Sequence, residues 1–139
     1  MTVDARGFDR PANRKERSDA EAQYRLGECY YNGDGVRKDL SEAVEWYREA
    51  AEQGHAEAQC QLGKCYYYGE GVSQDYPRAV KWYRKAAEQG NAYAMAALSG
   101  CYMLGEGVNE NKVEGIKWLR KSAKLGDPEA KKILKRLGL

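Results

Sequence analysis

The chain of 139 residues contains a single histidine and a single phenylalanine, and none of its four cysteines stands in a Cys-x-x-Cys pair. Zinc sites in proteins draw on closely spaced cysteines and histidines, so a metal site is not expected. No nucleophile recurs beside the lone His55, which argues against a role for it as a catalytic base. We therefore expect a protein that is not an enzyme and that needs no cofactor.

Long apolar runs and a strong net charge are also missing. The longest nearly uninterrupted apolar run, residues 92–104, is shorter than the roughly 20 residues that a membrane-spanning helix needs. The first residues contain no apolar segment typical of a signal peptide, which favours a cytoplasmic protein, or a periplasmic or secreted one if a leader has been removed. A formal net charge of +2 gives no global field that would attract nucleic acid. Membrane insertion and nucleic-acid binding are therefore not expected.

The charges are unevenly distributed along the chain. Residues 112–139 hold nine basic and three acidic side chains, whereas residues 18–111 hold nine basic and fifteen acidic ones. Cations near the C-termini of helices interact favourably with the helix dipole, so a solvated basic end is the simple interpretation. An acidic or phosphate-bearing partner at this end is the alternative.

The sequence does contain a clear internal repeat with a period of 36 residues. Gly-Asp-Gly-Val at Gly33 returns as Gly-Glu-Gly-Val at Gly69 and Gly105, and one leucine, one cysteine, one tyrosine and one tryptophan keep the same spacing. A period in the mid-thirties is typical of stacked helix pairs. The periodic tryptophans are expected in the core, and the periodic cysteines are expected to be small buried residues with free thiols.

Each repeat is predicted to form two helices. In the first half of a copy, Ala22, Leu26 and Tyr30 follow helical spacing, and the Gly-x-Gly loop that follows supplies the positive φ on which helices often end. Ser18 is predicted to cap the first of these helices, and His55 takes the capping position in the next repeat. The first helices are expected at 19–31, 56–68 and 92–104, the second helices from Asp39, Asp75 and Asn111 to the glycines at 54, 90 and 126, and a last helix from Pro128 to about Leu137.

The repeats resemble the Sel-1-like repeat family, which is related to the tetratricopeptide repeat. The shared pattern is A-x-x-x-L-G-x-C-Y-x-x-G-x-G-V-x-x-D-x-x-x-A-V-x-W-Y-R-x-A-A-E-Q-G, carried by 22–54 and 58–90 and more loosely by 94–126. The resemblance implies an all-α fold, a right-handed α/α superhelix. Its parts would be a polar tail at 1–17 and a repeat domain at 18–139, with repeats 19–54, 55–90 and 91–126 and a capping helix at 127–139.

The same resemblance places a partner-binding groove on the concave face, which the first helix of each repeat lines in related superhelices. We expect a groove that is polar and acidic at its start and apolar at its end, suited to an extended peptide or a partner helix. Tyrosines are enriched among the residues that dominate binding energy, although some here could simply pack between helices. The implied contact residues are Glu21, Tyr24, Glu28, Tyr31, Asn32, Lys64, Tyr67, Tyr68, Tyr93, Gly100, Met103 and Leu104, with Glu57, Cys60 and Ala96 beside them.

The function that the resemblance implies is a non-enzymatic adaptor that binds a protein or a peptide. The alternative is a bacterial cell-envelope factor or a toxin-neutralising immunity factor of the same fold. An encoded leader or a neighbouring toxin gene would favour that alternative. Weak self-association through the apolar end near Met103 is also expected, because three and a half repeats leave only a limited interior.

Overall fold

The computed structural model describes residues 2–3, 9–10 and 19–139. Two short strands, β1 (Thr2–Val3) and β2 (Asp9–Arg10), pair in antiparallel orientation, with Thr2 opposite Arg10. The sequence gives no sign of this ladder, because two-residue strands carry no recognisable alternation. Otherwise, the tail predicted at 1–17 lies outside the described residues.

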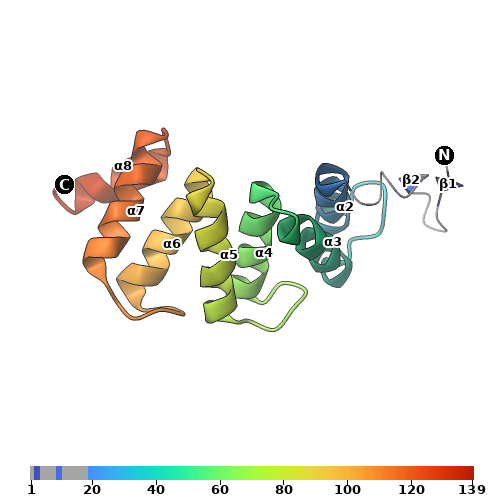
Figure 1. The fold of residues 1–139 in the computed structure, drawn as a ribbon, viewed down its shortest axis with the longest axis horizontal. Coiled ribbons are helices and arrows are strands. Elements are labelled where there is room, and N and C mark those ends of the chain that lie inside the picture. Colours follow the sequence, from blue (N-terminus) through green and yellow to red (C-terminus); the bar gives the residue numbers. More distant parts are fainter. Residues whose placement is uncertain (1, 4–8, 11–18) are drawn as a thin grey trace.

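The repeat region of the described chain consists of seven helices. They are α2 (Ala20–Asn32), α3 (Leu40–Glu52), α4 (Ala56–Tyr68), α5 (Tyr76–Glu88), α6 (Ala92–Leu104), α7 (Lys112–Lys124) and α8 (Pro128–Arg136). The helices follow one another in a single row, with α2 and α8 at opposite ends (Figure 1). Each helix packs mainly against the next helix in the sequence. This arrangement confirms the predicted solenoid of three helix pairs and a terminal helix.

The helix ends follow the predicted capping pattern with one exception. Asp39, Asp75 and Asn111 cap the second helices, each accepting a hydrogen bond from the backbone N–H three residues later at 3.0–3.1 Å. The first helix begins one residue later than expected. Its cap is Asp19, whose Oδ1 accepts from the N–H of Glu21 at 3.0 Å, so the prediction of Ser18 as the cap is wrong. The sequence offered two adjacent residues that can both cap a helix, and spacing alone chose the wrong one.

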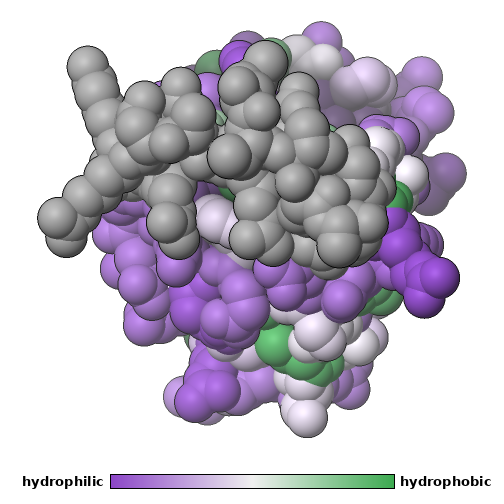
Figure 2. Space-filling model, turned by 90° about the vertical axis from the view of Figure 1, so that its right-hand side faces the viewer, coloured by the Kyte–Doolittle hydropathy of each residue, from purple (hydrophilic) through white to green (hydrophobic). Residues whose placement is uncertain are grey.

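The core runs between the paired helices. In the first two repeats, a glycine of the first helix faces a buried tyrosine of the second: Gly27 faces Tyr47, and Gly63 faces Tyr83. A Cβ atom on Gly63 would lie 2.8 Å from Cδ1 of Tyr83, so the ring fills the space that a side chain would need. In the third repeat, buried Ser99 and Leu119 occupy the two equivalent positions. Figure 2, which views the α2 end, shows mostly hydrophilic residues on the coloured surface.

The periodic tryptophans and cysteines are not equally buried. Trp82 and Trp118 are buried, but Trp46 is only half-buried. Two lysines lie over the ring of Trp82, with Nζ atoms 5.1 and 5.0 Å from its centroid, whereas glutamates occupy both equivalent places beside Trp46. The four cysteines carry free thiols; Cys60, Cys65 and Cys101 are buried and Cys29 is half-buried. The first repeat is therefore less completely covered than the expectation of uniform core positions implied.

Candidate functional site

The first helices of the repeats, together with α8, present one side of the stack, which we call the A-helix face (α2, α4, α6 and α8). All twelve predicted contact residues lie on α2, α4 and α6. Two hollows open on this face, and Tyr93 lines both of them. The first hollow is lined by Tyr24, Glu57, Cys60, Gln61, Lys64, Asn91 and Tyr93. The second hollow is lined by Tyr67, Tyr68, Tyr83, Tyr93, Ala96, Ala97, Gly100, Asp127 and Glu129.

Six of the twelve predicted residues therefore line these two hollows, and six do not. Among the latter, Glu21 bonds to His55, and Glu28 accepts hydrogen bonds from Tyr47 and from Gln61. Asn32 and Leu104 are exposed at the ends of α2 and α6, Leu104 with 70% of its surface accessible. Tyr31 and Met103 are engaged in packing. The six residues outside the hollows are Glu21, Glu28, Tyr31, Asn32, Met103 and Leu104.

Hydrogen bonds from Tyr31 and Tyr67 connect consecutive repeats. The hydroxyl of Tyr31 donates to Oε2 of Glu70 at 3.0 Å, and that of Tyr67 donates to Oε1 of Glu106 at 2.7 Å, both across 39 residues. The bond to Glu106, followed by burial, raises the pKa of Tyr67, so its hydroxyl stays protonated and remains a donor. These tyrosines have a packing role of the kind that the sequence analysis left open as the alternative to ligand contact.

Met103 occupies the equivalent position in the third repeat and packs differently. A Cβ atom on Gly115 would lie 2.8 Å from Cγ and from Sδ of Met103, so the methionine fills the space above this glycine. The adaptable thioether side chain therefore belongs to the α6–α7 contact. At the apolar end of the face, Leu104 is the side chain that remains accessible.

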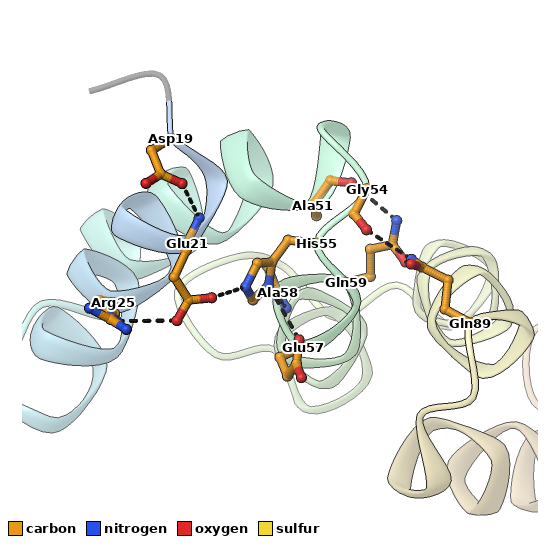
Figure 3. A network of polar contacts seen from close by, with 10 residues as sticks. All are labelled: Asp19, Glu21, Arg25, Ala51, Gly54, His55, Glu57, Ala58, Gln59 and Gln89. Carbon is orange, nitrogen blue, oxygen red and sulfur yellow. Dashed lines mark hydrogen bonds and ion pairs between the residues drawn. The ribbon is translucent and has the colours of Figure 1, made fainter. Parts of the chain in front are cut away.

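His55 joins α2 to α4 as a helix cap. Its Nδ1 accepts from the N–H of Ala58 at 3.1 Å, and its Nε2 lies 2.6 Å from Oε2 of Glu21 (Figure 3). Because Nδ1 acts as the acceptor, the proton of the neutral ring resides on Nε2 and is donated to Glu21. This hydrogen bond is the main reason that the pKa of Glu21 is lowered. The ring of Tyr24 stacks on His55 at a centroid distance of 4.7 Å, which gives the histidine a structural environment.

Replacing His55 should separate its capping role from its other contacts. We expect His55→Ala to lower the free energy of unfolding by about 1–2 kcal/mol, because the cap is lost. His55→Asn should lower it by less than about 1 kcal/mol, since Asn91 caps α6 by the same bond, from Ala94 N–H at 2.9 Å. Urea unfolding followed by circular dichroism measures both. Equal losses in the two variants would show that the cap contributes nothing.

The first hollow combines buried and charged groups. Burial raises the pKa of Tyr24 to about 12 and that of the Cys60 thiol to about 12. The Cys60 thiol therefore stays protonated near neutral pH and is a poor nucleophile. Lys64 is held to one side, its Nζ donating to the hydroxyl of Tyr31 at 3.2 Å. This hollow offers polar and aromatic contacts to a ligand rather than reactive groups.

The second hollow is an aromatic pocket with an acidic edge. The rings of Tyr67 and Tyr68 meet edge to face at 4.9 Å, and Tyr68 and Tyr93 are 59% and 54% exposed. Asp127 and Glu129 reach this hollow from the start of α8. The sequence analysis missed both carboxylates and Tyr83. A signal for the two carboxylates was present, because Asp127 and Glu129 stand one period of 36 residues after Asn91 and Tyr93, which line the first hollow.

Neither a membrane-spanning helix nor a metal-binding cluster is present in the part of the chain that the structure describes. No described helix combines the length and the apolar composition that crossing a bilayer requires. Among the same residues, no group of three or more histidine, cysteine, aspartate or glutamate side chains is arranged to hold a metal ion.

Comparison with solved structures finds the same fold in bacterial proteins. A Sel1 repeat protein from Oxalobacter formigenes is 40% identical with a TM-score of 0.82, over 86% of this chain and 49% of that protein. A protective antigen present in uropathogenic Escherichia coli strains, which displays an SLR fold, is 39% identical with a TM-score of 0.81, over 83% of this chain and 25% of that antigen. The chain thus spans about half of the Oxalobacter protein and about a quarter of the Escherichia coli antigen.

More distant similarity extends to the cysteine-rich protein B of Helicobacter pylori. That protein is 23% identical with a TM-score of 0.69, over 88% of this chain and 98% of the other, and it shows the fold alone. No curated protein matches the chain. The family model described as Sel1 repeat matches three times, at residues 20–55, 56–91 and 92–127. Since these matches cover most of the 139 residues, the chain belongs to the Sel1 repeat family.

Proposed function

We propose that this chain is a non-enzymatic adaptor that binds a partner protein or peptide on its A-helix face. Sel1 repeat proteins are generally protein-interaction modules, and their fold is typically a non-catalytic scaffold. Two side chains could have served catalysis, and both have structural roles. His55 caps a helix, and the thiol of Cys60 is buried. These observations support binding rather than chemistry.

The single observation that carries the proposal is the position of Tyr93. This side chain lines both hollows and is 54% exposed, so the two hollows adjoin along one track across the face. An extended peptide could lie along this track, with side chains entering both hollows. Tyrosine buries a large area at a low cost in conformational entropy, which makes Tyr93 and Tyr68 suitable anchors for a partner.

Photo-crosslinking in cells of the source organism tests the proposal. A benzophenone amino acid at position 93 should form a discrete adduct with a partner protein upon irradiation. Lys81, exposed on α5 and lining a different hollow with Lys85 and Val108, provides the control position. We expect an adduct from position 93 and none from position 81. Adducts of equal yield from both positions, or none from position 93, would contradict the proposal.

We further propose that the protein works in a reducing compartment, in line with the cytoplasmic expectation. The support is the state of its cysteines, all four of which are free thiols. Free thiols persist in cytosolic proteins and are uncommon in oxidising compartments.

A further inference from the structure

We propose that the second hollow receives a basic side chain, arginine or lysine, of the bound partner. This inference rests on the proposed function and identifies what the partner must present at this point of the face. It is drawn from three features of the hollow: its aromatic walls, its two carboxylates and the space at its floor.

The walls offer aromatic faces to a cation. Tyr67, Tyr68, Tyr83 and Tyr93 all line the hollow. The ring of Tyr67 lies 4.9 Å from Tyr68 and 6.4 Å from Tyr83, so these rings form one cluster. The hydroxyl of Tyr67 is bound to Glu106, which fixes the orientation of its ring. A cation within about 6 Å of such rings is attracted by their quadrupoles, most strongly where water is partly excluded.

The charges of the hollow have one sign. Among its nine lining residues, two are carboxylates, Asp127 and Glu129, and none is a lysine, arginine or histidine. Glu129 is paired with Lys132 at 3.3 Å, but both side chains are largely exposed. A surface pair of this kind is worth little, so an incoming cation can compete for the glutamate. The charge of the hollow therefore complements a basic ligand.

The position of the carboxylates at the start of α8 raises an opposing effect, because a helix N-terminus disfavours cations. Asp127 offsets it: its Oδ1 accepts the N–H of Glu129 at 3.1 Å, and its Oδ2 accepts the hydroxyl of Ser122 at 2.9 Å. The capping carboxylate thus neutralises part of the helix dipole and is held in place. Glu129 is left as the group that can move toward a ligand.

The floor of the hollow is made of small residues. Ala96, Ala97 and Gly100 of α6 line it, and a Cβ atom added to Gly100 would meet nothing within 4 Å. The equivalent positions in the two preceding repeats are Glu28 and Lys64, whose long side chains are committed to other contacts. The absence of a side chain at Gly100 therefore leaves open space at a position where the two preceding repeats carry a long side chain. An apolar side chain could enter this room, but it would take water from the edge of the hollow and offer the two carboxylates nothing in return.

Titration of the isolated 139-residue chain with N-acetyl-arginine amide, followed by ¹⁵N NMR, tests the inference. N-acetyl-citrulline amide is the matched neutral probe, because it has nearly the same shape and no charge. We expect saturable shifts at the backbone amides of Ala96, Ala97 and Gly100 with the arginine probe. The citrulline probe should bind roughly fivefold or more weakly, as expected for the loss of about 1 kcal/mol of cation–π and ionic attraction. Equal binding of the two probes would overturn the inference.

Variants locate the binding. Glu129→Gln and Tyr93→Leu should each weaken the arginine probe severalfold, since each removes one attractive group from the hollow. Glu110→Gln removes the same charge from an exposed site outside the hollow and should leave the affinity unchanged. Circular dichroism verifies that the variants are folded. Loss of affinity in Glu110→Gln to the same degree as in Glu129→Gln would indicate a general charge effect and would overturn the site.

The experiments distinguish a failure of the proposed adaptor function from a failure of the cation site. Selective arginine binding without a crosslinked partner from position 93 would support the cation site and remove the proposed function. A crosslinked partner without any preference for arginine over citrulline would overturn the cation site and leave the adaptor function standing.

Discussion

Replacing Gly71 by alanine should strongly destabilise the protein. Gly71 has φ of +74°, and a Cβ atom there would lie 2.3 Å from the carbonyl oxygen and 2.5 Å from the carbonyl carbon of Leu40. Those atoms belong to the backbone at the start of α3, so they cannot rotate away. We expect Gly71→Ala to lower the free energy of unfolding by about 3 kcal/mol or more, combining left-handed strain with a steric clash between repeats.

Gly90→Ala provides the matched control for this prediction. Gly90 also has a positive φ, +95°, but a Cβ atom there would meet nothing within 4 Å. The Gly90→Ala variant should therefore lose only about 1–2 kcal/mol of its free energy of unfolding, which is the cost of the left-handed conformation. The excess loss in Gly71→Ala then measures the close approach of one repeat to the next. Equal midpoints of urea unfolding for the two variants would show that this loop does not pack as described.

The second large effect concerns the glycine–tyrosine pairs of the core. Gly63→Ser should cost about 1–3 kcal/mol because its Cβ atom would overlap the ring of Tyr83. Tyr83→Leu should cost about 2–4 kcal/mol because it removes most of a buried ring. The double variant reproduces the Ser99 and Leu119 pair of the third repeat. It should therefore be more stable than the sum of the two losses predicts, by about 1 kcal/mol or more.

A double-mutant cycle of urea unfolding measures this coupling. The added serine hydroxyl can donate to a carbonyl of the preceding helical turn, so it need not remain unsatisfied. Gly100→Ala is the control for the effect of filling a glycine within a first helix, because open space surrounds that position. It should leave stability unchanged or raise it by up to about 1 kcal/mol. Strict additivity of the two core substitutions would refute the pairing.

Much of the architecture could be predicted because the pattern that marks each helix and loop occurs three times in the sequence. The helix bounds agree with the expected ranges to within a residue or two at most ends, since caps and Gly-x-Gly loops mark them. The prediction that Ser18 caps the first helix was wrong because Asp19 beside it can cap equally well. The differences between copies were harder to interpret. The third repeat replaces Gly–Tyr by Ser–Leu, and only the structure shows that the two positions that change are in contact in the other repeats.

The candidate site was predictable in its helices but not in its details. The resemblance directed attention to the face on which the two hollows open, and on that face Tyr31 and Met103 serve packing between elements. A signal for the tyrosine bonds was present, because Tyr31 and Tyr67 each precede a glutamate by 39 residues. The repeat also marks Asp127 and Glu129, which stand 36 residues after Asn91 and Tyr93 of the first hollow, but only the structure shows that Tyr93 lines both hollows.

Crosslinking from position 93, with mass spectrometry of the joined peptides, tests the central claim that the A-helix face binds a partner. The account predicts one dominant adduct from position 93, joined to a partner segment that contains an arginine or lysine within a few residues. It also predicts none from position 81, which faces a different hollow. A partner crosslinked at position 81 and absent at position 93 would place binding elsewhere on the molecule and contradict the account.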